Sequence, residues 1–538
     1  MATTILTAIL LVLFFGTMIL TGVYCRKHAT DVNGFVLGGR NVGPWLTAFA
    51  FGTSYFSAVI FVGYAGQFGW NFGLASTWIG LGNAFIGSLL AWVILGRRTR
   101  LMTQKLESRT MPDFFEKRYG SKALKIVASV IVFIFLIPYT ASLYNGLSSL
   151  FNIAFSIPYW VVIVAMAALT CVYVLFGGYM ATAINDFIQG IIMLVGIIAV
   201  IAALLIDNGG LSEAVTRLSA IESPYAATAG AQGAFTSFFG AQPFYLLIVV
   251  LLTSLGTWGL PQMVGKFYSI KNEDAIKKGT VISTLFAIVV AGGCYFIGGF
   301  GRLYTDKLVG EGGDPSTFKN FDSIVPTILS TLPDIVIAVV IILVLAASMS
   351  TLSSLVLTSA STLTLDVIMP IINRKKKDGA VSEKHKLVIL RSFVVFFVAI
   401  SAVIAIVKDM NPEFTFIAQM MGVSWGALAG AFLAPFMYGL YSKKVTRGAC
   451  YASFIFGTGI EIAQLVLMFA NISVSGIPFI GLIFTNSLYS GVFAMLGGMI
   501  LIPIVSLFTP ECDKETVDGI FTCYDTQVTV PVTDTLGK

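Results

Sequence analysis

The chain has little charge for its length. Asp, Glu, Lys and Arg make up 11% of its 538 residues, whereas soluble domains average about 25%. A water-soluble fold of this size needs more charge to cover its surface, so the composition excludes one. Histidine is scarce, with only His28 and His385, and the six cysteines show no metal-ligand spacing. The sequence therefore disfavours an enzyme embedded in the membrane, and no resident cofactor is expected.

The chain is rich in long apolar blocks, and hydrophobic residues make up 57% of it. A helix rises 1.5 Å per residue and needs about 20 apolar residues to cross a bilayer. The alternation typical of membrane barrel strands is not seen. We therefore predict an all-α integral membrane protein with about 13 transmembrane helices. The expected spans are residues 3–24, 43–66, 72–96, 124–149, 158–176, 181–206, 243–264, 280–299, 333–366, 388–407, 414–440, 449–470 and 479–508.

The net charge of +6 bears on orientation rather than on nucleic acid, because cytoplasmic loops of membrane proteins are enriched in Lys and Arg. With the C-terminus inside, the outer loops hold only five of the 33 basic residues. These five are Arg217, Arg302, Lys307, Lys319 and Lys408. We predict a multi-pass plasma (inner) membrane protein whose N-terminus lies outside. Residues 1–508 form one transporter domain and residues 509–538 a cytoplasmic tail. Short surface helices are expected at 212–221 and 321–330.

Two of the spans carry interruptions at mid-membrane depth. The second span contains glycine and hydroxyl residues over Phe51–Ser57, and the seventh contains them over Thr253–Pro261. Small residues also serve close helix packing. The two interrupted spans are five apart, so they run in opposite directions, and such a pair points to a transporter site. We predict inverted repeats over about 43–206 and 243–440, with one extra helix before them and two after.

The ninth span carries a run of small and hydroxyl residues, Ala346–Ser354. Helical spacing puts several of these on one face. Hydroxyl and carbonyl oxygens suit a hard cation such as Na⁺. In the alternative interpretation, each hydroxyl bonds the carbonyl four residues before it. Opposite a broken helix, the cation site is the favoured interpretation. The residues expected on this face are Ala347, Ser350, Thr351 and Ser354, with Ser353 beside them.

Asp186 and Glu461 fall within predicted spans, where carboxylates are commonly functional. Asp186 is interpreted either as a helix cap or as a second cation ligand. Glu461 lies outside the repeats, so a structural pair or a protonated carboxyl is expected there. Either carboxyl could instead serve a proton-coupled carrier of the same fold, which is the main alternative. A sensor derived from a transporter is the third.

Several linked motifs resemble those of the sodium:solute symporters, whose members include bacterial proline and pantothenate carriers. They are Phe35–Arg40, Thr53–Ser57, Phe176–Gly178, Asp186–Gly190 and Ala346–Ser354. The resemblance implies a leucine-transporter-type 5+5 inverted repeat. It also implies Na⁺-coupled import of a small organic solute by alternating access. The expected partners are Na⁺, the solute and the lipid bilayer, with no nucleic acid, and the protein is expected to work as a monomer.

The resemblance also implies site residues. The main sodium site is expected at Thr53, Phe56, Ala347, Ser350 and Thr351. A second sodium site, found in some members, maps to Asp186, Ser350, Ser353 and Ser354. Expected solute contacts are Ser57, Gly63, Tyr139, Thr257, Trp258, Pro261 and Gln419. Proline carriers of the family place an acidic residue where this chain has Tyr55, which favours pantothenate-like members. The solute is left open between an amino acid such as proline and a carboxylate such as pantothenate.

Overall fold

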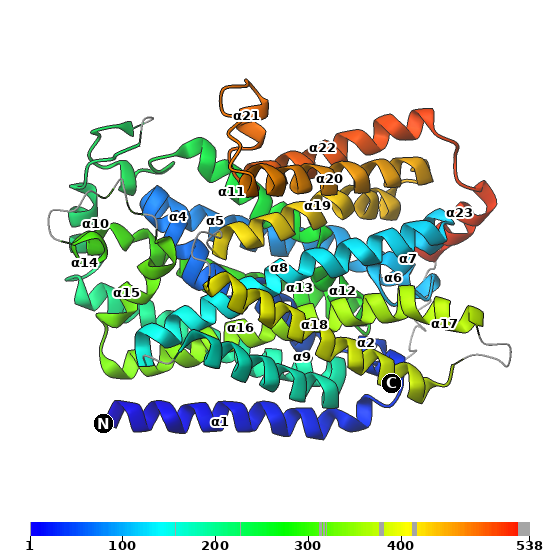
Figure 1. Ribbon diagram of the computed structural model, residues 1–538, viewed down its shortest axis with the longest axis horizontal. Coiled ribbons are helices and arrows are strands. Elements are labelled where there is room, and N and C mark those ends of the chain that lie inside the picture. The colour runs from blue at the N-terminus through cyan, green and yellow to red at the C-terminus, as the bar shows by residue number, and fades with distance from the viewer. Residues whose placement is uncertain are drawn as a thin grey trace, which may run out of the picture.

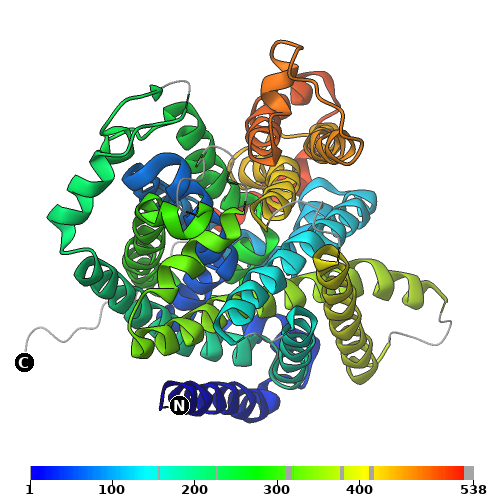
Figure 2. The ribbon, with the colours of Figure 1, turned by 60° about the vertical axis from the view of Figure 1, so that its left-hand side comes forward.

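The computed structural model is a bundle of helices (Figures 1 and 2). It describes residues 2–155, 158–225, 228–310, 315, 318, 320–375, 381–410 and 417–525. Within these ranges no strand occurs, and the only β-type pairing is an isolated bridge. The α-helices are α1 (Ala2–Cys25), α2 (Val32–Leu37), α3 (Pro44–Tyr55), α4 (Ala65–Phe72), α5 (Thr77–Gly82), α6 (Arg97–Lys105), α7 (Met111–Tyr119), α8 (Lys122–Phe155), α9 (Tyr159–Asp207), α10 (Leu211–Ser219), α11 (Pro243–Leu255), α12 (Pro261–Ser269), α13 (Glu273–Gly299), α14 (Thr305–Val309), α15 (Ile324–Ser330), α16 (Asp334–Thr362), α17 (Met369–Lys375), α18 (Glu383–Asp409), α19 (Ile417–Tyr441), α20 (Arg447–Phe469), α21 (Ile480–Ile483), α22 (Ser487–Phe508) and α23 (Lys514–Phe521). Wider π-helical turns are η3 (Val59–Tyr64), η5 (Asn83–Leu90), η6 (Trp92–Gly96) and η13 (Leu363–Ile368).

The apolar helices are long enough for many membrane crossings. Ten described segments meet the length and hydropathy of a span, or 11 if one bent pair counts as a single span. Two of them, Val59–Lys105 and Tyr159–Asp207, are 47 and 49 residues long. That is about twice what one crossing needs. The protein is therefore all-helical and polytopic, while the count of 13 stays a prediction.

The first predicted interruption is a real break in the helix. α3 ends at Tyr55, and Phe56 leaves helical geometry with φ −100° and ψ 97°. The chain resumes at Val59 as the π-helical turn η3 and continues into α4. The last carbonyls of a helix lack partners within it. The end of α3 thus presents carbonyl oxygens inside the bundle, since Thr53, Tyr55 and Phe56 are all buried.

The second interruption is also present. α11 passes through the 3₁₀ turn Gly256–Gly259 (η9) to Leu260, which is extended at φ −85° and ψ 120°. α12 then starts with Pro261 as its first residue and runs at 47° to α11. Proline is suited to the first turn of a helix, where its missing N–H has no intrahelical partner in any case. Pro261 therefore ends one half-helix and begins the next.

The two broken segments are tied together at one end of the bundle. The Val42 N–H, just before α3, donates to the Ser269 carbonyl at 3.1 Å. The Lys271 N–H donates in return to the Val42 carbonyl at 3.1 Å. These bonds form a parallel bridge that joins the residues just before α3 to those just after α12.

α9 combines the predicted fifth and sixth spans. Gly178 has φ 54° and ψ −148°, so α9 is two helices joined at a kink. A Cβ at this glycine would lie 2.8 Å from the Phe35 carbonyl oxygen. Glycine is required here for both the positive φ and the close approach of α2.

The helices outside the predicted repeats flank the bundle. α1 lies along one side, and α20 and α22 lie along the opposite side (Figures 1 and 2). α10 forms as predicted at residues 211–219. The expected surface helix near 321–330 is partly wrong. α15 buries Ile324, Val325 and Leu329. These apolar side chains pack against the core instead of facing water.

A cluster of ion pairs connects α7 to the start of α8. Lys125 Nζ lies 3.0 Å from Asp113 Oδ1 and 2.7 Å from Glu116 Oε2. Lys117 Nζ lies 3.0 Å from the second oxygen of Asp113. Burial alone would raise the pKa of Asp113, but the two lysines outweigh it and hold that pKa below its ordinary value. These ion pairs hold α7 against the start of α8.

The tail is ordered beyond the predicted last span. α23 docks on the same end of the bundle, where Lys443 Nζ lies 2.7 Å from Asp518 Oδ1. The Arg98 guanidinium lies 4.5 Å from the ring centre of Tyr524. The sequence analysis expected only a tail here. Residues 526–538 lie outside the described part of the chain.

Candidate functional site

Four of the five residues expected at the main sodium site meet where α3 breaks. The Ser350 hydroxyl lies 3.1 Å from the Thr53 carbonyl oxygen, and the Thr351 hydroxyl lies 3.2 Å from it. The same two hydroxyls lie 3.1 and 3.2 Å from the Ala347 carbonyl oxygen. All four residues are buried. Phe56, the fifth, follows at the break itself. Oxygens from α3 and α16 therefore form one compact cluster.

The hydroxyls in this cluster differ from those that serve only their own helix. Ser348, on the same helix, donates to the Val344 carbonyl of α16 at 2.8 Å. Ser350 and Thr351 each face a carbonyl on α16 and a carbonyl on α3. Each hydroxyl has one proton for two acceptors, so lone pairs remain available. This is the donor chemistry that an alkali cation needs.

The residues expected at a second sodium site are also close together, with an addition that the sequence analysis missed. Ser354 Oγ lies 2.7 Å from Ser54 Oγ and 2.9 Å from the ammonium of Lys266. Lys266 Nζ is in turn 3.7 Å from Asp186 Oδ2. Ser353 donates to the Ser350 carbonyl of its own helix at 2.9 Å. A buried lysine thus occupies the position between Asp186 and Ser354.

Asp186 is not the helix cap that one interpretation proposed. It is fully buried, and neither carboxylate oxygen accepts a hydrogen bond from a described residue. A cap accepts from backbone N–H groups at a helix start. Asp186 instead lies well inside the second half of α9, where Lys266 supplies its counter-charge.

The expected solute contacts fall into two groups. Ser57 and Tyr139 have buried hydroxyls that make no hydrogen bond to any described residue, and Trp425 has an indole N–H in the same condition. The Ser57 and Trp425 side chains lie within interaction range of the Tyr139 hydroxyl, but no pair among the three has the distance and angle of a hydrogen bond. The Tyr139 and Trp425 rings lie 6.0 Å apart, edge to face. Three donors therefore gather beside the break after α3, and Trp425 was missed by the sequence analysis.

Tyr55 completes an aromatic wall at this place. Its ring stacks on Phe56 at 4.4 Å and lies 6.0 Å from Trp425. Its hydroxyl donates to the Thr253 carbonyl of α11. The residue that departs from the proline carriers therefore links the two broken helices.

The polar groups of the other expected contacts are engaged elsewhere. Thr257 donates to the Ser254 carbonyl at 2.8 Å, and Trp258 donates to the Ile86 carbonyl at 3.1 Å. Gly63 is buried within η3. Pro261 lines a cavity beside Lys266. Gln419 lines a separate cavity of 440 Å³ formed by α19, α20 and the segment before α22. None of these contacts brings any of the five residues next to Tyr139.

Glu461 lies in a different part of the bundle, between α19, α20 and α22. Its Oε1 accepts from Ser490 at 2.9 Å, and it is fully buried. A Cβ on Gly426 would lie 2.3 Å from that oxygen, so glycine makes room for it. The second oxygen of Glu461, Oε2, has no hydrogen-bond partner among the described residues. The expected structural pair or protonated carboxyl at Glu461 therefore stays a prediction.

The geometry agrees with a family comparison. The model of the sodium:solute symporter family matches residues 35–457. The chain belongs to this family. The resemblance drawn from the motifs is confirmed, and the match spans both broken helices and the hydroxyl cluster of α16.

Curated relatives in this family are proline transporters. The chain is 30% identical over 449 residues to the osmoregulated proline transporter OpuE of Bacillus subtilis, covering 83% of this chain and 86% of that protein. It is 27% identical over 523 residues to sodium/proline symporter 2 of Staphylococcus saprophyticus, covering 96% and 95%. Both relatives are proline transporters by name, and the second, which matches nearly the full length of this chain, is named as sodium-coupled.

The solved structures show the same fold. A substrate-bound, outward-open Na⁺-coupled sialic acid symporter superposes with a TM-score of 0.71 at 17% identity, covering 95% of this chain and 98% of that one. The leucine-transporter-type fold that the family resemblance implied is confirmed. At this identity the likeness bears on the fold alone.

Proposed function

We propose that this symporter imports a small zwitterionic amino acid, with proline as the first candidate, together with Na⁺. The observation that carries the ion assignment is the cluster of Thr53, Ala347, Ser350 and Thr351 oxygens at the break of α3. A cation bound there bridges the two helices that must move against each other during alternating access.

The three buried donors beside the break support a carboxylate on the solute. Ser57, Tyr139 and Trp425 each present an O–H or N–H without a partner among the described residues. A buried donor without a partner costs roughly 1–3 kcal/mol. A solute carboxylate accepts several such hydrogen bonds at once, and charge-assisted bonds are the stronger kind. Binding a carboxylate therefore stabilises this part of the protein.

The aromatic wall supports a positive group on the same solute. Tyr55, Tyr139 and Trp425 present rings near the three donors. A cation over such a face gains about 0.5–2 kcal/mol. Tyr55 thereby replaces the acidic residue of the proline carriers with a neutral partner for an ammonium. Together with the names of the relatives, this favours an amino acid over pantothenate, which has no ammonium.

The ion and solute positions share one short segment, which supports coupling. Thr53 and Phe56 belong to the proposed ion site, and Ser57 follows directly with its donor. An ion that fixes the end of α3 also fixes the position of Ser57. Coupling of this kind is reciprocal and typically amounts to about 1–3 kcal/mol. The inward membrane potential adds about 2.3 kcal/mol per charge per 100 mV.

Uptake into proteoliposomes tests the proposal. With an inward Na⁺ gradient, labelled proline is expected to accumulate, and choline in place of Na⁺ is expected to abolish accumulation. A panel of unlabelled amino acids, betaines and pantothenate identifies competitors. Accumulation driven by a pH gradient without Na⁺ would support the proton-coupled alternative. Competition by pantothenate but not by proline would contradict the solute assignment.

Replacing the Tyr139 hydroxyl tests the solute site more closely. Tyr139→Phe is expected to raise the KM for solute about tenfold, since one hydrogen bond to a charged group contributes about 1.5–3 kcal/mol. Thr140→Val is the matched control, because that hydroxyl donates to the Leu136 carbonyl of its own helix. Equal KM values for the two variants would exclude Tyr139 from the solute site.

A further inference from the structure

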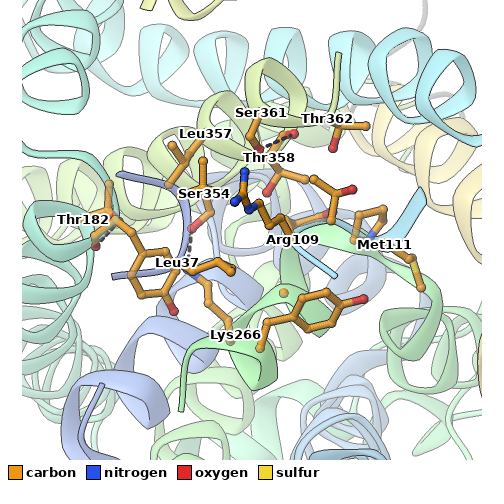
Figure 3. Close-up of a pocket in the computed structure, with 17 residues that line it drawn as sticks. Leu37, Arg109, Met111, Thr182, Lys266, Ser354, Leu357, Thr358, Ser361 and Thr362 are labelled. Carbon is orange, nitrogen blue, oxygen red and sulfur yellow. Dashed lines mark hydrogen bonds between the residues drawn. The ribbon is translucent and has the colours of Figure 1, made fainter. Parts of the chain in front are cut away.

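The core of the transporter contains a buried lysine, Lys266, on α12. Lys266 is 4% exposed. Its ammonium donates to Ser354 on α16 at 2.9 Å and lies 3.7 Å from Asp186 on α9. Figure 3 shows the lysine and Ser354 at one wall of a cavity of 50 Å³. Three helices of the transport core thus meet at this one nitrogen.

The surroundings are those of a cation site. Asp186 accepts no hydrogen bond from another described residue, so its only described ion pair is the one with Lys266. Ser354 also contacts Ser54 on α3 at 2.7 Å. The ring of Tyr179 lies 5.5 Å from the ammonium. A carboxylate, hydroxyls and an aromatic face therefore all turn toward the same positive charge.

This position coincides with the second sodium site that the family resemblance implies. Two of its expected residues, Asp186 and Ser354, are in contact with Lys266. A third, Ser353, donates to a carbonyl of its own helix. A Na⁺ ion placed between them would meet the ammonium at contact distance. Like charges repel strongly in a buried place of low dielectric, so the lysine and the ion exclude each other.

We propose that Lys266 is a tethered cation that takes the place of a second Na⁺, so that the transporter binds one Na⁺ rather than two. The ammonium holds α9, α12 and α16 together as an ion would, but it is not released in the cycle. The inference rests on the proposed main site at Ser350 and Thr351, which supplies the single remaining ion. One positive charge is then moved for each zwitterionic solute.

Counting bound ²²Na⁺ on the purified full-length protein tests this directly. The wild-type protein is expected to bind one Na⁺ per chain, with a Hill coefficient near 1. Lys266→Ala removes the ammonium and leaves Asp186, Ser354 and space for an ion. It is expected to bind two Na⁺ per chain. Lys271→Ala removes an exposed lysine just after α12 and is the matched control, expected to bind one.

A double variant shows whether the second Na⁺ in Lys266→Ala binds at Asp186 or results from a general loosening of the fold. Lys266→Ala combined with Asp186→Asn lacks both charges, and its count is expected to return to one. Two ions on the wild-type protein, or one on a well-folded Lys266→Ala variant, would overturn the tethered cation while leaving the main site in place. No ion on the wild-type protein and one on Lys266→Ala would support the lysine's role but contradict the proposed main site. No ion on either would overturn both.

Discussion

Removing both hydroxyls of the α16 cluster is expected to lower the apparent Na⁺ affinity by about a hundredfold or more. Ser350→Ala and Thr351→Val each delete one oxygen that faces Thr53 and Ala347. A bond to a charged group contributes about 1.5–3 kcal/mol, and 1.4 kcal/mol corresponds to a factor of ten. Each single variant should therefore lose about tenfold or more. The measurement is the Na⁺ concentration that gives half-maximal uptake.

Ser348→Ala is the matched control for this pair. Ser348 is buried on the same helix, but its hydroxyl donates to Val344 within α16. Its Na⁺ dependence is expected to stay at the wild-type value. If the double variant at Ser350 and Thr351 kept wild-type Na⁺ dependence, the main site would lie elsewhere.

Gly298→Ala is expected to cost about 3 kcal/mol or more in stability, near the upper end of what overpacking usually costs. A Cβ at this position of α13 would lie 1.9 Å from the Ala65 carbonyl oxygen, at the start of α4. From the other side, a Cβ on Gly69 would lie 1.9 Å from the Gly298 carbonyl oxygen. Backbone cannot rotate away as a side chain can, so α4 and α13 must separate.

The matched control is on the same helix. A Cβ on Gly292 meets nothing within 4 Å, so Gly292→Ala is expected to express and melt like the wild-type protein. Gly298→Ala should show a lower melting temperature and less monodisperse protein. Equal melting curves for the two variants would mean that α4 does not approach α13 as closely as described.

The broken helices were predictable because their cause is local. Pro261 cannot continue a helix from the preceding turn, and glycines on either side weaken it further. The hydroxyl face of α16 was predictable for a similar reason. Helical spacing alone aligns Ala347, Ser350 and Thr351, and a broken helix elsewhere in the chain supplies the missing carbonyls.

Lys266 was not predictable in the same way. The sequence analysis placed the end of the seventh span at residue 264, so it counted Lys266 among the basic residues of an inner loop. In the structure the break at Pro261 starts a new half-helix, and α12 carries the lysine into the core. Pro261 itself indicated this outcome, because a proline that starts a new half-helix extends the buried segment beyond it. A carboxylate within a membrane span, such as Asp186, also indicates a cation close by.

The solute pocket was only partly predictable. Aromatic residues fill membrane helices everywhere, so spacing does not separate Tyr139 from Trp258. What separates them is the hydrogen-bond partner of each polar group. Trp258 donates to Ile86, whereas Tyr139 and Trp425 have no described acceptor. That distinction depends on tertiary contacts between α8, α19 and the break after α3.

The arrangement also explains how one ion can control the solute. Thr53, Tyr55 and Ser57 lie within five residues at the break of α3. The Thr53 carbonyl faces the α16 hydroxyls, the Tyr55 hydroxyl donates to the Thr253 carbonyl on α11, and Ser57 lies beside the Tyr139 hydroxyl. A displacement of this short segment changes all three sets of contacts. Alternating access then follows from which contacts the Na⁺ ion holds in place.

The proposed sodium site can be observed by cryo-electron microscopy of the protein in lipid nanodiscs, in NaCl and in choline chloride. In NaCl we expect density for one ion enclosed by the carbonyls of Thr53, Phe56 and Ala347 and the hydroxyls of Ser350 and Thr351. That density should be missing in choline chloride. A map in which Ser350 and Thr351 face lipid, or in which this position is the same in both salts, would contradict the proposed site.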